Sequence, residues 1–222
     1  MSARPNPGRW IAFAARLRRD RSAVAYLEFA LSLPAVLGLF IGGSELANLA
    51  IVHTRLSQIA SATADNAARV RDRIDEADIN EIYFGMSKGD GSLNLLEHGR
   101  LIISSVEDNT ATTTNLTDQK IVWQRCKGVK NAASSYGVEA QVLSQGIGAG
   151  TRRISATAGN PVIFVQLFYD YQPLFTNAIF GTQVITYSSA FSVRDRADNS
   201  IQNGGNLAGA AKATCNYFNA AV

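Results

Sequence analysis

The chain has 222 residues, of which 46% are hydrophobic and 18% are charged, and its mean hydropathy is close to zero. This composition excludes a disordered tail, which lacks the apolar residues for a core, and it excludes a membrane protein with many spans. The net charge is +3, but the first 21 residues contain six arginines and one acidic residue, so they carry +5 and the rest carries −2. A basic charge confined to a leader before an apolar run indicates membrane topology rather than nucleic-acid binding.

An apolar segment follows this leader over residues 22–44, and Glu28 is its only charged residue. A helix of this length is roughly 35 Å long and crosses a hydrocarbon core of about 30 Å. Because arginine-rich flanks stay in the cytoplasm, the sequence predicts a single-pass protein whose residues from Glu45 onward lie on the far side. The alternative is a cleaved secretory signal, with the small residues after Gly42 as its cleavage site.

Glu28 is the most informative residue of the apolar segment. A carboxylate about one turn inside a membrane helix costs roughly 2.5 to 3.5 kcal/mol on insertion scales. Such residues usually have a partner or a function, although a carboxylate near the headgroups can also snorkel toward the arginines. Its position alone leaves both explanations open.

The residues around Glu28 resemble the amino terminus of a known family. The run RSAVAYLEFAL over residues 21–31, followed by Leu33 and Pro34, is similar to the signature of the TadE-like pilus assembly proteins, relatives of the type IV pilins. The similarity is strong over about residues 18–70. It is weaker over the later strands.

This resemblance implies specific roles for four residues. In the family a basic leader ends at a small residue, and a glutamate followed by an aromatic residue stands at the fifth position of the mature chain. By this spacing, residues 1–23 are the cytoplasmic leader, and a prepilin peptidase cleaves between Ala23 and Val24. Glu28 and Phe29 are then the assembly residues. Alanine at position 23 departs from the glycine that is usual before the cleaved bond.

A physical argument also favours assembly. Removal of the leader leaves a free α-ammonium on Val24 at the membrane surface, and Glu28 of a neighbouring subunit can pair with it as the helices stack. Loss of the arginines releases the cytoplasmic anchor at the same time. Pro34 removes a backbone hydrogen bond to Ala30 and predicts a helix bend, with an ordinary membrane-helix proline as the alternative.

After Glu45 the uniformly apolar pattern becomes periodic. Apolar and small residues recur at separations of three and four, which is typical of an amphipathic helix. Because no proline occurs between Pro34 and Pro161, we predict one continuous helix to about Asp75, with a transmembrane part over 24–44 and an amphipathic extension over 45–75. We expect the stripe to pack on a sheet, and a stalk or coiled-coil dimer is the alternative. The stripe consists of Leu49, Val52, Leu56, Ile59, Thr63, Ala67, Val70 and Ile74.

The sequence pattern over residues 76–222 predicts an extracytoplasmic, pilin-like α+β domain. A short helix is expected over residues 79–86, before a turn at 89–91. Alternating patterns then predict four strands, which begin at Arg100, Lys120, Pro161 and Gln183. We expect these strands to form a meandering four-stranded antiparallel sheet packed against the long helix. Residues 135–157 lack a clear period and are expected to form a surface excursion.

The two cysteines, Cys126 and Cys215, are consistent with an oxidising compartment. If they pair, the bond pins a tail rich in glycine, asparagine and alanine to the second strand, and chain-entropy models credit so long a loop with roughly 4 to 5 kcal/mol. We predict that they pair. Two isolated thiols are the alternative.

The sequence contains no motif that predicts catalysis. Its two histidines, His53 and His98, have no partner at metal-ligand spacing. Zinc-protease, nucleophile-elbow and Walker motifs are missing from the sequence. We therefore expect no enzyme, no cofactor and no metal site.

The resemblance implies a minor pilin or pseudopilin of a tight-adherence, type IVb-like pilus, which acts by protein–protein assembly in pilus biogenesis. The implied partners are other pseudopilins and pilin subunits, the inner-membrane pilus platform, a prepilin peptidase and the membrane, without nucleic acid. The implied location is the bacterial inner membrane, with the N-terminus cytoplasmic and the C-terminal domain periplasmic or incorporated into a pilus. The alternative is a permanently anchored periplasmic binding or sensor domain, which retention of residues 1–23 would favour.

Overall fold

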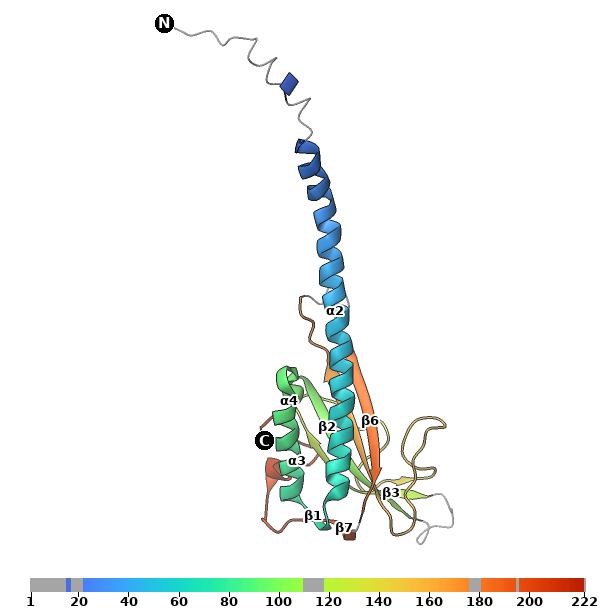
Figure 1. The fold of residues 1–222 in the computed structure, drawn as a ribbon. Helices are drawn as coiled ribbons and strands as arrows, with labels where there is room; N and C mark the ends of the chain where they lie inside the picture. The colour runs from blue at the N-terminus through green and yellow to red at the C-terminus, as the bar shows by residue number, and fades with distance from the viewer. Residues whose placement is uncertain (1–14, 17–21, 110–117, 176–180, 195, 222) are drawn as a thin grey trace. The chain divides into compact units, whose positions relative to one another are not determined.

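The computed structural model of the chain describes residues 15–16, 22–109, 118–175, 181–194 and 196–221 (Figure 1). The chain divides into two units, Met1–Ala47 and Asn48–Val222. Helix α2 (Ser22–Arg69) begins in the first unit and ends in the second. The predicted continuity of this helix beyond Glu45 is therefore confirmed.

The end of α2 differs from the prediction, because the helix stops at Arg69 and not near Asp75. Strand β1 (Asp72–Asp75) follows and pairs in parallel with β7 (Arg196–Gln202). The buried Arg196 side chain donates from Nη2 to the Ala67 carbonyl at 2.6 Å and from Nε to the Val70 carbonyl at 3.1 Å. These bonds satisfy carbonyls at the helix end, where intrahelical partners are lacking. A partner more than a hundred residues away in sequence therefore contributes to the helix boundary, and the local pattern does not reveal it.

Helix α3 (Glu76–Gly89) starts directly after β1. The Asp75 side chain accepts from the Ala77 N–H at 2.9 Å, and the Asp78 side chain accepts from the Asp75 N–H at 2.8 Å. This reciprocal capping box fixes the start of the helix. The predicted helix is confirmed and is longer at both ends. A 3-10 turn, η1 (Gly91–Leu93), and a short helix, α4 (Leu95–His98), lead into the sheet.

The main sheet has five antiparallel strands in the order β4-β3-β2-β5-β6. Four of them confirm the predicted strands, but the predicted number was wrong because β4 adds a fifth. That strand has two residues and lies within the predicted surface excursion, so it is too short to show an alternating pattern. The strands are β2 (Gly99–Asp108), β3 (Gln119–Lys127), β4 (Val142–Leu143), β5 (Val162–Asp170) and β6 (Val184–Ser192).

The strand order also differs from the predicted meander, since β5 pairs with β2 and not with β3. Strands β3 and β5 therefore flank β2 and run in the same direction. Residues 128–161 connect them, and a connection of this length can return along the sheet, which a hairpin cannot do. The alternating pattern identifies strands but does not identify the neighbour of each strand.

The two faces of the sheet are covered by different parts of the chain. Residues 48–69 of α2, with α3, cover one face and form the main hydrophobic core. The opposite face carries a smaller cluster, in which Ile147 of the excursion packs with strand residues. The predicted packing of the helical stripe on a sheet is thus confirmed. The main core includes Val52, Leu56, Ala60, Ala64 and Ala67 from α2, and Leu101, Ile103, Trp123, Ile163, Val165 and Leu167 from the strands.

Candidate assembly site

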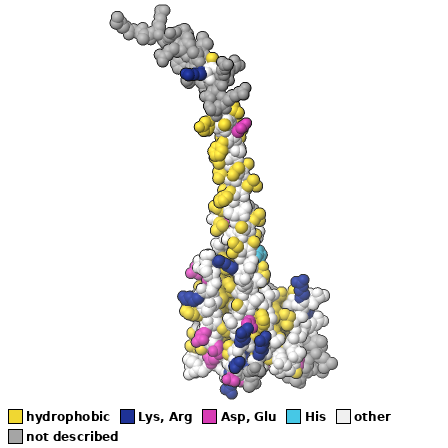
Figure 2. Space-filling view, in the orientation of Figure 1, with side chains coloured by type: hydrophobic (Ala, Val, Ile, Leu, Met, Phe, Trp, Pro, Cys, Tyr) yellow, Lys and Arg dark blue, Asp and Glu magenta, His cyan; other side chains and the backbone are white. Residues whose placement is uncertain are grey.

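The part of α2 in the first unit exposes large apolar side chains along its length (Figure 2). Among the described residues, α2 is the one helix that is long and apolar enough to cross a membrane, with a mean hydropathy of 2.0 in its most apolar stretch. A helix that is apolar on all sides needs lipid or other helices around it. The exposed side chains are Val24, Tyr26, Leu27, Phe29, Leu31, Leu33, Val36, Leu37, Leu39, Phe40 and Leu46.

The predicted assembly residues lie on this helix and are accessible. Val24 is 54% exposed, Phe29 is 63% exposed, and Glu28 is also exposed. Within the described part of the chain, the Glu28 carboxylate has no ion-pair partner. Val24 and Glu28 are four residues apart, so they lie on the same side of the helix. A helix packed against that side would therefore meet both side chains.

The two serines of the segment 24–44 contrast with Glu28. Ser32 Oγ donates to the Phe29 carbonyl at 3.0 Å, and Ser44 Oγ donates to the Phe40 carbonyl at 2.8 Å. Bonds of this kind satisfy hydroxyl groups inside a membrane helix. Pro34 lies inside α2 and does not end it, and the predicted bend at this residue stays a prediction.

The predicted cleavage site lies at the start of α2. The backbone of Ala23 belongs to the helix, as does Val24. The predicted leader lies outside the described residues except for residues 15–16 and the backbone of 22–23. Cleavage therefore stays a prediction.

The predicted disulfide between Cys126 and Cys215 is confirmed, with a Cα–Cα distance of 4.7 Å. Backbone bonds support it, because the Cys126 N–H donates to the Ala213 carbonyl at 2.7 Å and the Gly128 N–H donates to the Asn219 carbonyl at 2.9 Å. The disulfide therefore belongs to a wider attachment of the C-terminal tail to β3.

Arg100 adds to the attachment of the tail, a role that the sequence alone does not predict. Its Nη2 donates to the Cys215 carbonyl at 2.6 Å, and its guanidinium lies 3.9 Å from the centroid of the Phe218 ring. Burial lowers the pKa of Arg100, whose side chain is 1% exposed. No local signal marks this arginine, because it occupies an ordinary position in an alternating strand.

We expect thiol labelling of the unreduced, denatured protein to detect no free cysteine, and labelling after reduction to detect both. Because a disulfide restricts the unfolded chain, Cys215→Ser is expected to lower the free energy of unfolding by about 2 to 5 kcal/mol. Chemical denaturation of the full chain in detergent measures this change. Two labelled sites in the unreduced protein would contradict the pairing.

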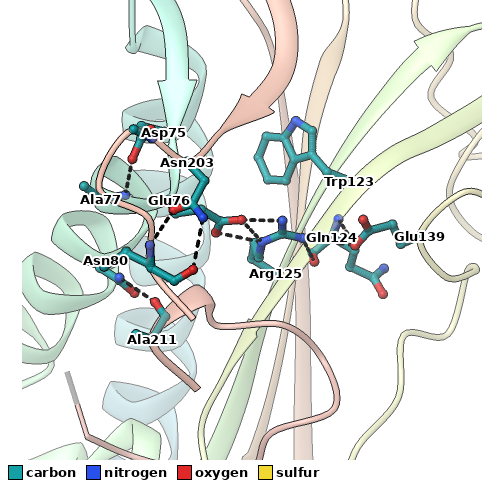
Figure 3. A network of polar contacts seen from close by, with 12 residues as sticks. Asp75, Glu76, Ala77, Asn80, Trp123, Gln124, Arg125, Glu139, Asn203 and Ala211 are labelled. Atoms are coloured by element: carbon teal, nitrogen blue, oxygen red, sulfur yellow. Dashed lines mark hydrogen bonds and ion pairs between the residues drawn. The ribbon is translucent and has the colours of Figure 1, made fainter. Parts of the chain in front are cut away.

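A buried ion pair joins α3 to the sheet (Figure 3). Arg125 of β3 donates from Nε to Glu76 Oε2 at 2.9 Å and from Nη2 to Glu76 Oε1 at 2.5 Å. Its Nη1 donates to Glu139 Oε2 of the excursion at 3.0 Å. Burial by itself lowers the pKa of Arg125, but the bonds to Glu76 and Glu139 outweigh burial and raise it. The sequence pattern does not reveal this network, because its three members lie on separate elements without a spacing that connects them.

A groove and the distribution of metal-ligating side chains bear on binding chemistry. A groove of about 440 Å³ lies between α2 and α3, and its lining includes Arg55, Ile59, Thr63, Ile82 and Met86. In the described ranges, no group of three or more His, Cys, Asp and Glu side chains is arranged to hold a metal ion. His53 Nδ1 lies 3.0 Å from the Tyr187 hydroxyl, so this histidine contacts β6.

No protein-family model, curated protein or solved structure matches the chain.

Proposed function

We propose that this chain is a minor pilin or pseudopilin, similar to the TadE-like proteins, that acts in the biogenesis of a tight-adherence pilus. The proposal rests on the exposure of the Glu28 carboxylate and on its lack of an ion-pair partner among the described residues. This exposed carboxylate has no ion-pair partner among the described residues, although it lies in a helix whose other exposed side chains are mostly apolar. Its position four residues after Val24 matches the spacing of the family signature.

A partner on another subunit explains this arrangement in physical terms. A lone carboxylate in a membrane helix is costly, and a nearby positive charge offsets the cost in a low dielectric. Cleavage before Val24 supplies an ammonium group, and the same cleavage removes the arginines that hold the leader in the cytoplasm. Helices with this pair of charges attract one another laterally as they leave the membrane. The helix then assembles with other pilin subunits at the inner-membrane platform.

Cleavage between Ala23 and Val24 is the first expected outcome. The prepilin peptidase is expected to accept Ala23 because alanine, like glycine, is small. Amino-terminal sequencing of the protein from native membranes should then begin at Val24. Material that begins only at Met1 or Ser2 would contradict cleavage and favour a permanently anchored binding or sensor domain.

Deletion of the gene in the native host tests the function itself. Pili counted by electron microscopy are expected to be lost in the deletion strain and restored by the wild-type chain. Normal piliation in the deletion strain would refute a role in pilus biogenesis, whatever the state of the leader.

A further inference from the structure

The edge of the main sheet at β3 is covered by other segments of the chain. Strand β4 pairs with the first two residues of β3, and the excursion and the C-terminal tail bind the amides that follow. The strand pair β2–β3 also contains a bulge, next to Ser105. This edge has little capacity for another strand. Four backbone N–H groups at this edge are already bonded. The Ile121 N–H donates to the Gln141 carbonyl, and the Gln124 N–H donates to Glu139 Oε2. The Cys126 N–H donates to the Ala213 carbonyl, and the Gly128 N–H donates to the Asn219 carbonyl.

At the opposite edge of the sheet, no described segment pairs with the free side of β6. The Tyr171 N–H donates to the Gln183 carbonyl at 2.9 Å, and the Val193 N–H donates to the Pro161 carbonyl at 2.8 Å. Bonded and non-bonded pairs alternate in an antiparallel ladder. The backbone N–H and C=O groups of the odd-numbered residues of β6 therefore bond to β5, and those of the even-numbered residues point away from β5, out of the sheet edge. Within the described ranges, the backbone groups of these outward residues bond to no other segment. The outward set is Val184, Thr186, Ser188, Ala190 and Ser192.

Strand β6 also lacks the features that protect natural sheet edges. Edge strands are commonly shielded by lysine, proline, bulges or short length. The sequence VITYSSAFS contains no charged residue, no proline and no glycine, and its pairing with β5 runs over all nine residues without a register shift. A long, uncharged and regular edge is suited to pairing with an added strand.

We propose that the β6 edge is the docking site for an extended segment of another protein, which adds a strand to the sheet. Backbone hydrogen bonds would provide affinity, and side chains at every second position would provide specificity. Tyr187 and Phe191 of β6 point toward the main core but are only partly buried against it. Apolar residues of the added strand beside these rings would extend the core. The partner segment is therefore extended, uncharged and apolar at alternate positions.

The direction of β6 argues against pairing with the β6 edge of a second copy of this chain. Tyr187, Ser189 and Arg194 contact residues progressively later in α2, so β6 runs in the same direction as residues 48–69 of α2 (Figure 1). An antiparallel pair of identical β6 edges requires a two-fold axis that reverses this helix. Subunits assembled into one pilus share a single direction, and this step rests on the proposed function. A symmetric parallel pair would place identical backbone groups opposite each other, N–H against N–H, and so could not form a ladder.

Hydrogen exchange resolved to single amides tests the proposal on the full chain in lipid nanodiscs. In the isolated protein, the outward amides are expected to exchange about 100-fold faster than the odd-numbered amides of β6. The probe is a short synthetic peptide that alternates threonine and valine, and the control is the same peptide with a central proline. The alternating peptide should slow the outward amides to the rate of the inner ones, and the proline peptide should not.

Three outcomes would overturn the proposal. The first is protection of the outward amides in the isolated monomer, which would mean that the edge is already covered. The second is unchanged exchange at saturating peptide. The third is protection that rises with protein concentration together with dimer formation, which would identify a second copy as the partner.

A pair of proline variants separates docking from folding. Ser188→Pro removes an outward N–H and no bond to β5, whereas Ser189→Pro removes a bond to β5. Ser188→Pro is expected to keep the unfolding midpoint of the wild type and to lose the peptide effect, and Ser189→Pro is expected to lower the midpoint. Thr186→Lys places a charge at the edge and is the second variant if Ser188→Pro fails to fold. Undiminished peptide protection in a folded Ser188→Pro or Thr186→Lys protein would refute docking at β6.

The two proposals fail in different experiments. Normal piliation after gene deletion would refute the proposed function and leave the peptide result intact. Missing peptide protection would refute the docking site and leave the deletion result intact.

Discussion

Replacement of Glu76 by glutamine is expected to lower the free energy of unfolding by about 3 to 5 kcal/mol. The Arg125 side chain is 5% exposed and the Glu76 side chain is 1% exposed, so the variant leaves a buried guanidinium without its main counter-charge. Removal of one partner from a buried pair is strongly destabilising because the remaining charge cannot regain its hydration. Urea unfolding of the full chain in detergent, followed by the fluorescence of the buried Trp123, measures the loss.

Glu139→Gln is the matched control for this prediction. Glu139 binds the same arginine at 3.0 Å, but its side chain is 50% exposed. Water screens such a contact, so we expect a loss below about 1 kcal/mol. The double variant Glu76→Leu, Arg125→Met removes both buried charges and is expected to be more stable than Glu76→Gln. Equal losses for Glu76→Gln and Glu139→Gln would show that burial does not determine the strength of this pair.

The elements with long regular patterns could be predicted from the sequence. The three- and four-residue spacing from Leu49 onward predicted a helix that packs on a sheet, and the alternating segments predicted β2, β3, β5 and β6. These patterns are local consequences of burying one face of an element.

Features that depend on distant partners could not be predicted in this way. Residues of β1 belong to a strand because β7 lies beside them, and Arg196 binds the carbonyls at the end of α2. The two residues of β4 are paired by β3 and carry no pattern of their own. The order of the strands depends on the path of residues 128–161, which have no clear period.

Some candidate sites can likewise be recognised from the sequence, and others only from the folded structure. Glu28 and the cysteines are unusual residues for their surroundings, so the sequence alone identifies them. The pairing of Glu76 with Arg125 requires the packing of α3 on β3. The open edge at β6 requires the register with β5, since that register determines which amides point outward. Ordinary serine and threonine side chains on that strand give no indication of it.

Glu28→Ala is expected to keep the chain in the membrane and to abolish pilus assembly. Removal of the carboxylate should make insertion of the helix about 2 to 3 kcal/mol more favourable, so the amount in the membrane should be normal or higher. The Val24 ammonium would lose its partner on the neighbouring subunit, which leaves an unpaired charge at the helix interface. Ser32→Ala is the control, because it removes a polar group four residues later that is already bonded within its own helix.

The most direct test of the assembly mechanism counts pili per cell and measures the membrane level of the chain in the same cultures. Cells that carry only Glu28→Ala should show a normal membrane level and no pili, while Ser32→Ala cells should match the wild type in both measurements. Normal piliation with Glu28→Ala at a normal membrane level would contradict the proposed pairing of Glu28 between subunits.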